Sequence, residues 1–396
     1  MALGNAERAR WFAARPDVRL CLLVPDSAVG VSPVTAAVAP APELYPYASK
    51  PWLPYPVLRV PRRAALAQID AALERIAPDL VVVTDPERSY MFASWGMPGH
   101  AHARRHGVPY VAQYQSDYLN FAASYPLWRH LRTPVFRPVM RHVYRHFDAA
   151  LCATPHAAAT LGGLSDVPTR HIPFVGVDIG DFGADRADPT VLTRLAPRYD
   201  GRGRRVLYLG RLAREKRLDL VIGAFLRLSA LPGNEDLSLF IAGEGPRDIT
   251  TRIRKLAAAS PRIHLLGFVH GTDRSALYAA SHAFCTGSPY ETFGRTVVEA
   301  MASGVPVVTP SSGGISDTLA DGHHAYLFPP GDAGALVEAL RAALADEGKV
   351  TGRARTAAAR FATERGCAQL LAGYRRLTHA YVPHRPVDDT GSRRLS

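Results

Sequence analysis

Short apolar runs bounded by Pro, Asp or Gly recur along the first half of the chain. They lie at residues 18–25, 78–85, 109–117 and 149–155. Continuous apolar runs of this length are typical of strands that are buried on both faces of a parallel sheet. Because stretches of helical composition separate the runs, the pattern predicts repeated βαβ units up to about residue 177. We interpret residues 32–61, which are rich in Pro, Ala and Tyr, as a long surface excursion.

A second alternating series begins near residue 204. Its predicted strands lie at residues 204–210, 237–245, 262–269, 282–289 and 305–310, with helices at 216–231 and 294–304 between them. Alternating strands and helices imply a parallel sheet with helices on both faces. The predicted fold class is therefore α/β, with two Rossmann-like domains that face each other across a cleft. Ligands are expected at the carboxyl ends of the strands.

The change of pattern also sets the expected domain limits. Residues around 176–204 combine many Asp, Gly, Pro and Arg residues with little apolar periodicity, so we expect the interdomain linker at 181–204. The two domains then cover residues 1–180 and 205–363. A helix is expected at 364–381, and the polar tail 382–396 is expected to be disordered.

Composition and charge narrow the functional classes. The chain has 396 residues, of which 47% are hydrophobic and 21% charged, as in ordinary globular proteins. Its net charge of +12 favours anionic partners, such as a nucleotide diphosphate or an acidic membrane surface. No recognition motif accompanies the arginines, so nucleic-acid binding is not expected. The cysteines have neither disulfide nor zinc-ligand spacing, being Cys21, Cys152, Cys285 and Cys367.

The hydropathy pattern suggests a location. No run approaches the roughly 18 apolar residues of a membrane span, and the N-terminal segment lacks the apolar core of a secretory signal. We therefore expect a cytoplasmic protein. Residues 127–147 interleave aromatic residues with Arg and His, which is compatible with peripheral contact to the inner membrane face. Pro134 and Pro138 interrupt any single helix there, and a solvated cationic face is the commoner explanation.

Residues 287–314 carry the densest chemistry. Glu291 follows a predicted strand, and Gly294 opens a helix that has Glu299 in its second turn. Free amides at a helix start bind phosphate or hydroxyl oxygens, and carboxylates accept hydrogen bonds from vicinal hydroxyls. A hexose and a ribose joined by a diphosphate would suit both kinds of group.

Arg211 and Lys216 follow the first strand of the second domain. The guanidinium offers a planar fork of donors and the ammonium a compact charge, and together they suit a diphosphate. Basic residues after a strand also commonly solvate the entrance of a helix, and this alternative stays open for the segment taken alone.

These segments together resemble retaining glycosyltransferases of the family-4 type, which have the GT-B fold. The shared motifs occur in order at residues 210–219, 241–246, 265–269, 289–308 and 313–332. The resemblance implies an enzyme that moves a hexose from GDP-mannose or a UDP-hexose to a hydroxyl of a lipid, glycan or small molecule. It also implies retention of the anomeric configuration, no cofactor, no metal, and a C-terminal helix that returns toward the N-terminal domain.

The resemblance assigns roles motif by motif, and it makes the second domain the nucleotide-sugar-binding one. Arg211 and Lys216 would bind the diphosphate and Glu291 the sugar hydroxyls. These three would be the catalytic residues. The further donor contacts that it implies are Gly210, Gly243, Gly245, Phe268, Val269, Thr292, Phe293, Gly294 and Glu299. Of these, Glu299 would take the ribose. A tight turn is the simpler explanation of the two glycines at 243 and 245, and both explanations can hold at once.

The first domain, which would bind the acceptor, departs from the family in two ways. The family usually has an opening strand before a glycine loop, whereas this chain begins almost at that loop, with Gly4 and Asn5. We therefore expect a missing central strand, through an upstream start site or a truncation, and unpaired strand edges. The second departure is Gln115, two residues before Asp117, where family members often carry His. The residues expected on the acceptor or donor-sugar side are Gly4, Asn5, Gln115 and Asp117. Of these, Gln115 can contact sugar or phosphate but cannot act as an acid or base.

Two other functions stay open at this point. A GT-B sugar epimerase or phosphorylase would share the two-domain architecture. A catalytically impaired nucleotide-sugar-binding protein would fit the missing strand and the glutamine at position 115.

Overall fold

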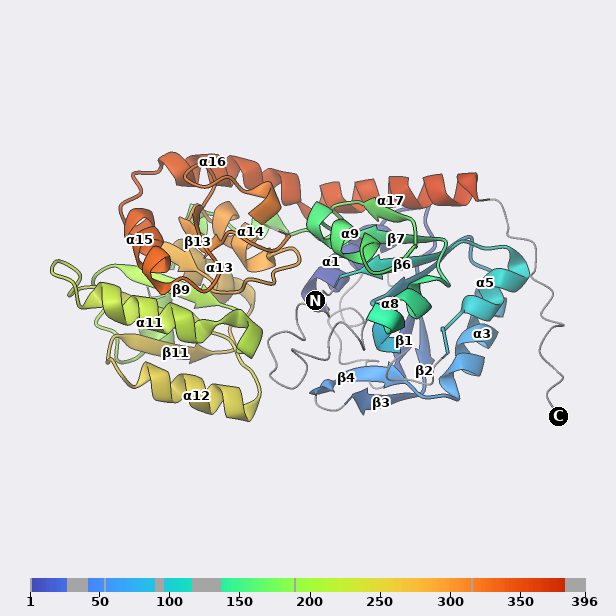
Figure 1. The fold of residues 1–396 in the computed structure, drawn as a ribbon, viewed down its shortest axis with the longest axis horizontal. Helices are drawn as coiled ribbons and strands as arrows, with labels where there is room; N and C mark the ends of the chain where they lie inside the picture. Colours follow the sequence, from blue (N-terminus) through green and yellow to red (C-terminus); the bar gives the residue numbers. More distant parts are fainter. Residues whose placement is uncertain are drawn as a thin grey trace.

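A computed structural model describes residues 2–26, 42–52, 55–89, 96–115, 137–188, 190–314 and 316–381. The chain forms two α/β lobes that lie beside each other along the longest axis of the molecule (Figure 1). Each lobe has its own parallel sheet, as the alternating apolar runs predict.

The C-terminal lobe is built on a six-stranded sheet. Its strands are β9 (Arg205–Leu209), β10 (Ser238–Ala242), β11 (Ile263–Gly267), β12 (Ala283–Cys285), β13 (Val307–Pro310) and β14 (Tyr326–Phe328). They lie in the order β11-β10-β9-β12-β13-β14, and every neighbouring pair is parallel. The five strands predicted from apolar runs are confirmed. Strand β14 was not predicted, because two of its three residues are only partly buried and give no continuous apolar run.

Helices cover both faces of this sheet. One face packs against α11 (Leu218–Ser229), α12 (Arg247–Ala257) and α15 (Ala333–Leu344), and the other against α13 (Gly271–Ala279), α14 (Arg295–Ala302) and α16 (Lys349–Ala358). Successive side chains of β9 point to opposite faces of the sheet. Val206 and Tyr208 pack on the side of α11, α12 and α15, and Leu207 packs on the side of α13, α14 and α16.

The N-terminal lobe holds a four-stranded parallel sheet in the order β5-β6-β7-β8. Its strands are β5 (Val81–Thr84), β6 (Tyr110–Tyr114), β7 (Ala149–Cys152) and β8 (Thr169–His171), and its helices are α3 (Ala65–Ile76), α4 (Pro86–Ser89), α5 (His100–His106), α8 (Arg137–Tyr144) and α9 (Pro155–Gly162). The predicted strands near residues 81, 110 and 149 are confirmed. Strand β8 was missed because it is short and mostly exposed.

The expected surface excursion at residues 32–61 is wrong for its second half. Residues 43–61 form β2 (Glu43–Tyr47), β3 (Ser49–Trp52) and β4 (Tyr55–Pro61), with β2 parallel to β1 (Cys21–Pro25) and β3 antiparallel to β4. Each of these three strands contains a proline, which obscures a strand signal in the sequence. In the described part of the chain, β1–β2 and β5–β8 are separate sheets.

The N-terminal loop expected at Gly4 and Asn5 is a helix instead. Both residues lie in α1 (Ala2–Ala13), where the Arg8 guanidinium donates to the Asn5 side-chain oxygen one turn earlier, at 2.5 Å. The alanine-rich composition of this segment also favours a helix.

Helix α17 (Thr363–Ala380) confirms the predicted C-terminal helix. It crosses from the C-terminal lobe and lies along the N-terminal lobe (Figure 1). Phe12 of α1 packs with Cys367 and Leu370 of α17 in one buried cluster. The two chain crossings between the lobes are paired, because the Val177 amide donates to the Phe361 carbonyl at 3.0 Å and the Thr363 amide to the Val177 carbonyl at 3.1 Å.

The segment expected to be a linker, residues 181–204, packs into the C-terminal lobe. It contains helix α10 (Val191–Leu195), and Phe182, Val191, Leu192 and Tyr199 are buried in the same core as Leu207. These apolar residues are too few and too widely spaced to produce a periodic signal, so the sequence indicated only an irregular connection.

Some expectations fall on residues that the structure does not describe. These are the disordered tail at 382–396, Asp117, and residues 127–136 of the basic stretch at 127–147. Among the described helices, none combines the length and the apolar character that crossing a bilayer requires.

Candidate functional site

Two loops at the carboxyl end of the C-terminal sheet lie against each other through glycines. The Gly210 amide donates to the Ala242 carbonyl at 3.0 Å, and the Leu212 amide donates to the Glu244 carbonyl at 2.8 Å. Gly243 has a φ of 144°, and a Cβ atom there would collide with the Gly210 carbonyl oxygen. A Cβ at Gly245 would collide with the Leu212 carbonyl in the same way. These glycines are therefore needed for the close approach of the β9 and β10 loops.

An ion pair joins the loops that follow the neighbouring strands β9 and β12. The Lys216 ammonium, in a 3-10 turn over Arg214–Lys216, donates to the Glu291 carboxylate. Only 19% and 16% of the two side chains are exposed. Because β9 and β12 pair in parallel, their carboxyl ends meet at one edge, and residues 75 positions apart come into contact.

Arg211 is held by an acidic residue that the sequence did not single out. Its guanidinium donates to the Glu215 carboxylate at 2.6 Å, and Glu215 is almost fully buried while Arg211 is about half exposed. The Tyr208 hydroxyl donates to the Arg211 carbonyl at 3.0 Å and so fixes the backbone. The spacing of Arg211 and Glu215 is the only sequence signal that could have indicated this contact.

Glu299, on α14, lies in a buried cluster. It is 2% exposed, accepts a hydrogen bond from the Tyr278 hydroxyl at 3.0 Å, and has the Arg274 and Arg295 guanidinium groups at 3.6 and 3.8 Å. Burial raises the pKa of Glu299, and Arg274, Arg295 and Tyr278 oppose that shift. Glu299, which the resemblance assigns to the ribose, is therefore covered by protein groups in this structure.

Arg295 also ties the two lobes together. Its two terminal nitrogens donate to the two carboxylate oxygens of Glu7 at 2.8 and 2.9 Å, and it donates to the carbonyl of Gly176 as well. Burial alone would lower the pKa of Arg295, but the hydrogen bond and charge of Glu7 and the charge of Glu299 outweigh it and raise the pKa. Glu7 lies on α1, 288 residues away, so no local pattern could have revealed this contact.

A cavity of about 410 Å³ lies between the lobes. His156 and Ala157, at the start of α9, line it from the N-terminal lobe. The residues that line it from the C-terminal lobe are Arg217, Pro289, Tyr290, Glu291, Thr292, Ser312, Gly313, Pro330 and Gly331. Of the three expected catalytic residues, only Glu291 is among those that line the cavity. Lys216 contacts Glu291, and Arg211 contacts Glu215.

The glycine pair at 313 and 314 shapes this wall of the cavity. The Gly314 amide donates to the Glu291 carbonyl at 2.7 Å, and Gly313 has a φ of 84°. A Cβ atom at Gly314 would collide with the Thr292 carbonyl and with the Thr154 hydroxyl of the N-terminal lobe. The loop that carries Glu291 is thus held by backbone contacts that leave no room for side chains.

The remaining expected donor residues take different positions. Phe293 is buried and its ring lies 5.8 Å from that of Phe361, while Gly294 starts α14 with a φ of 75°. Phe268 is 64% exposed, and Val269 is buried in the core. The exposed ring of Phe268 lies just beyond the carboxyl end of β11. Ligands of parallel α/β sheets bind at this edge.

Gln115 lies just beyond the carboxyl end of β6 in the N-terminal lobe. The backbone amide of Gln115 donates to the Asp85 carboxylate at 2.9 Å. With the side-chain oxygen facing Arg8, that oxygen accepts from the guanidinium at 2.7 Å. Gln115 is therefore a partner of α1, a role that its sequence position alone did not indicate.

Comparison with known proteins defines the class. The solved HepE of Anabaena in complex with UDP-glucose superposes with a TM-score of 0.70 over 94% of this chain and 95% of that one, at 17% identity. A sucrose-phosphate synthase of Thermosynechococcus elongatus gives 0.73 over 94% and 92%, at 20% identity. The chain has the GT-B fold of glycosyltransferases. Residues 196–362 match the family "Glycosyl transferases group 1".

Sequence relatives agree with this family. A GDP-mannose-dependent alpha-mannosyltransferase of Mycolicibacterium smegmatis is 35% identical over 223 residues, which are 56% of this chain and 55% of the relative. A protein of the same description from Mycobacterium tuberculosis is 33% identical over 265 residues, or 66% of this chain and 63% of the relative. The matches thus span between half and two thirds of these relatives' length.

The glycine contacts generate a matched pair of predictions. Gly243→Ala is expected to lower the free energy of unfolding by about 1–3 kcal/mol, because the new Cβ meets the Gly210 carbonyl at a positive φ. Gly223→Ala, inside α11 with nothing near its Cβ position, is the control and should leave stability unchanged or raise it by up to about 1 kcal/mol. Urea unfolding measures both. Equal stability of the two variants would show that the loop contact is not needed.

Proposed function

We propose that the chain is a retaining glycosyltransferase that moves a hexose from a nucleotide diphosphate sugar to a hydroxyl group. The observation that carries the proposal is the Lys216–Glu291 pair at the edge of the cavity between the lobes. It supplies one cation and one carboxylate at the carboxyl ends of two parallel strands, where the sheet rule places ligands. Arg211 adds a second cation after the same strand as Lys216.

The mechanism divides the work between positioning and charge. The bond from the anomeric carbon to the diphosphate oxygen breaks while the acceptor oxygen bonds to the same carbon, and the acceptor proton passes to the departing phosphate. Lys216 and Arg211 stabilise the negative charge that develops on this phosphate, so the proposal requires no metal ion. Glu291 accepts hydrogen bonds from the sugar hydroxyls and fixes the anomeric carbon near the acceptor.

The proposed ribose contact of Glu299 requires a local change. Because this carboxylate is 2% exposed and lies between Arg274 and Arg295, a ribose hydroxyl would have to displace one guanidinium. Arg295 is itself bound to Glu7 of the N-terminal lobe. Donor binding through Glu299 would therefore act on a contact between the lobes.

The acceptor is the less defined substrate. We propose a hydroxyl on a lipid, a glycan or a small molecule, reached from the N-terminal lobe, where His156 lines the cavity. The net charge of +12 would favour an acceptor held at an anionic membrane surface.

The donor can be tested directly. We propose GDP-mannose, supported by the two mycobacterial relatives whose names specify it. GDP-mannose should raise the melting temperature of the protein more than UDP-glucose or ADP-glucose do at equal concentration, because a ligand that binds only the folded state stabilises it. A shift with UDP-glucose alone would overturn the choice of base, and no shift with any nucleotide sugar would overturn the transferase proposal.

Removing the Lys216 ammonium should abolish most of the turnover. Lys216→Ala is expected to lower kcat by about 100-fold or more, since the leaving phosphate loses its compact cation. The exposed Lys255→Ala on α12 is the matched control and should retain normal kcat. The measurement is hexose transfer from the stabilising donor. Near-normal kcat in Lys216→Ala would contradict the proposal, and donor binding without any transfer in the wild type would instead favour a nucleotide-sugar-binding protein.

A further inference from the structure

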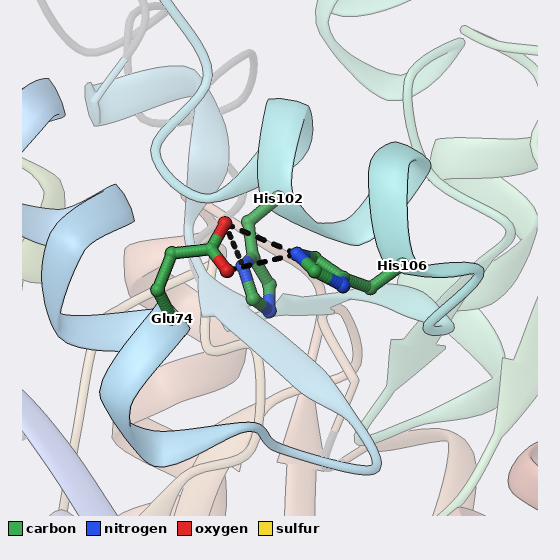
Figure 2. Close-up of side chains that lie close together, drawn as sticks. All are labelled: Glu74, His102 and His106. Carbon is green, nitrogen blue, oxygen red and sulfur yellow. Dashed lines mark hydrogen bonds and ion pairs between the residues drawn. The ribbon is translucent and has the colours of Figure 1, made fainter.

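Two histidines and a glutamate meet on the N-terminal lobe, away from the donor cavity. Glu74 lies on α3, and His102 and His106 lie on α5; Figure 2 shows both imidazoles turned toward the carboxylate. One donor atom from each residue lies within 4.8 Å of the other two. Helices α3 and α5 stand at the outer end of this lobe, far from the C-terminal lobe (Figure 1).

The fold fixes all three side chains on one seam. His102 and His106 are one helical turn apart, so they share a face of α5, and their ring centroids are 4.4 Å apart. Leu73 of α3 and Ala103 of α5 are buried in the same core cluster, which holds the two helices together beside this face. The cluster is thus set by packing and does not depend on exposed chain.

The contacts place the carboxylate between the two rings. His102 Nδ1 lies 3.2 Å from Glu74 Oε1, and His106 Nε2 lies 2.9 Å from Glu74 Oε2. His102 is only 2% exposed, and its other ring nitrogen, Nε2, is buried with no hydrogen-bond partner. A nearly buried imidazole is therefore held with Nδ1 directed at the carboxylate.

The donor set has a clear chemical preference. Two imidazole nitrogens and one carboxylate oxygen are ligands typical of zinc and other divalent transition metals, whereas magnesium and calcium prefer oxygen ligands alone. Ligands at about 2.0–2.2 Å from a tetrahedral zinc ion lie about 3.4 Å apart, so small side-chain rotations would bring these three atoms into place.

One side chain competes for the site. The Arg105 guanidinium donates to Glu74 Oε1 at 2.6 Å. About 61% of the Arg105 side chain is exposed, so it can turn into solvent when a cation binds. Because a metal ion must displace Arg105 from Glu74, this contact lowers the affinity of the site for the metal. Removing the Arg105 side chain should raise that affinity.

We propose that Glu74, His102 and His106 bind one divalent transition-metal ion, with zinc as the preferred ion and solvent completing its coordination. Such an ion would clamp α3 to α5 and stabilise the N-terminal lobe. It lies apart from Lys216 and Glu291, so it takes no part in the sugar transfer. The spacing of His102 and His106 was present in the sequence, but Glu74 is 28 residues upstream and only the fold adds it.

The test measures zinc binding to the full chain after treatment with a chelator. Competition with a chromophoric chelator should show one zinc ion bound per chain, and cobalt should give the visible absorption of a tetrahedral site. His106→Ala and Glu74→Gln should weaken zinc binding by more than about tenfold, since even an outer partner of a metal ligand contributes about 10- to 100-fold. Zinc should raise the melting temperature of the wild type and not of these variants.

Two further variants sharpen the result. His171→Ala, an exposed histidine on β8 of the same lobe, should bind zinc as the wild type does. Arg105→Ala should bind zinc more tightly, because the competing cation is gone. The proposal is overturned if the wild type binds no zinc, or if His106→Ala and Glu74→Gln bind it as tightly as the wild type.

Discussion

The Lys216–Glu291 ion pair is the contact on which the candidate site depends. It forms because β9 and β12 are neighbours in a parallel sheet, so that the loops at their carboxyl ends share one edge. A cation and a carboxylate with so little exposed surface are a costly arrangement unless each is compensated, and each compensates the other. In the proposed mechanism, the ammonium turns to the diphosphate and the carboxylate to the sugar when a nucleotide sugar binds, so the pair holds both groups ready.

Near this pair, Arg295 makes contacts that join the two lobes. Arg295 stands at the start of α14, close to the loop that carries Glu291, and it binds Glu7 on α1, the Gly176 carbonyl and Glu299. The paired crossings at Val177 and Ala362 lie next to it. The Arg295 guanidinium thus contacts both the N-terminal lobe and Glu299, the residue expected to bind the ribose. The position of that lobe and the charge around Glu299 are therefore coupled. Any movement of the lobes on donor binding would act on this group.

The sequence predicted what depends on local pattern. The buried strands of the C-terminal sheet are continuous apolar runs, so the fold class could be predicted. The loops with Lys216 and Glu291 follow two of these runs, so both loops of the candidate site could be placed at the carboxyl ends of strands. The strands at 43–61 contain prolines, and the segment at 181–204 buries a few isolated apolar residues, so neither gave a periodic signal. Contacts such as Glu7–Arg295 and Glu74–His106 join distant positions, and only the packed structure brings them together.

The most direct test of the account is the contribution of the diphosphate to binding. Calorimetry would compare GDP with guanosine, and UDP with uridine, in the wild type and in Lys216→Ala. The account predicts that the diphosphate strengthens binding of the preferred base in the wild type, and that Lys216→Ala removes about 10- to 100-fold of this gain while the nucleoside binds unchanged. An equal gain from the diphosphate in both proteins would contradict the central claim that this lysine binds the leaving group.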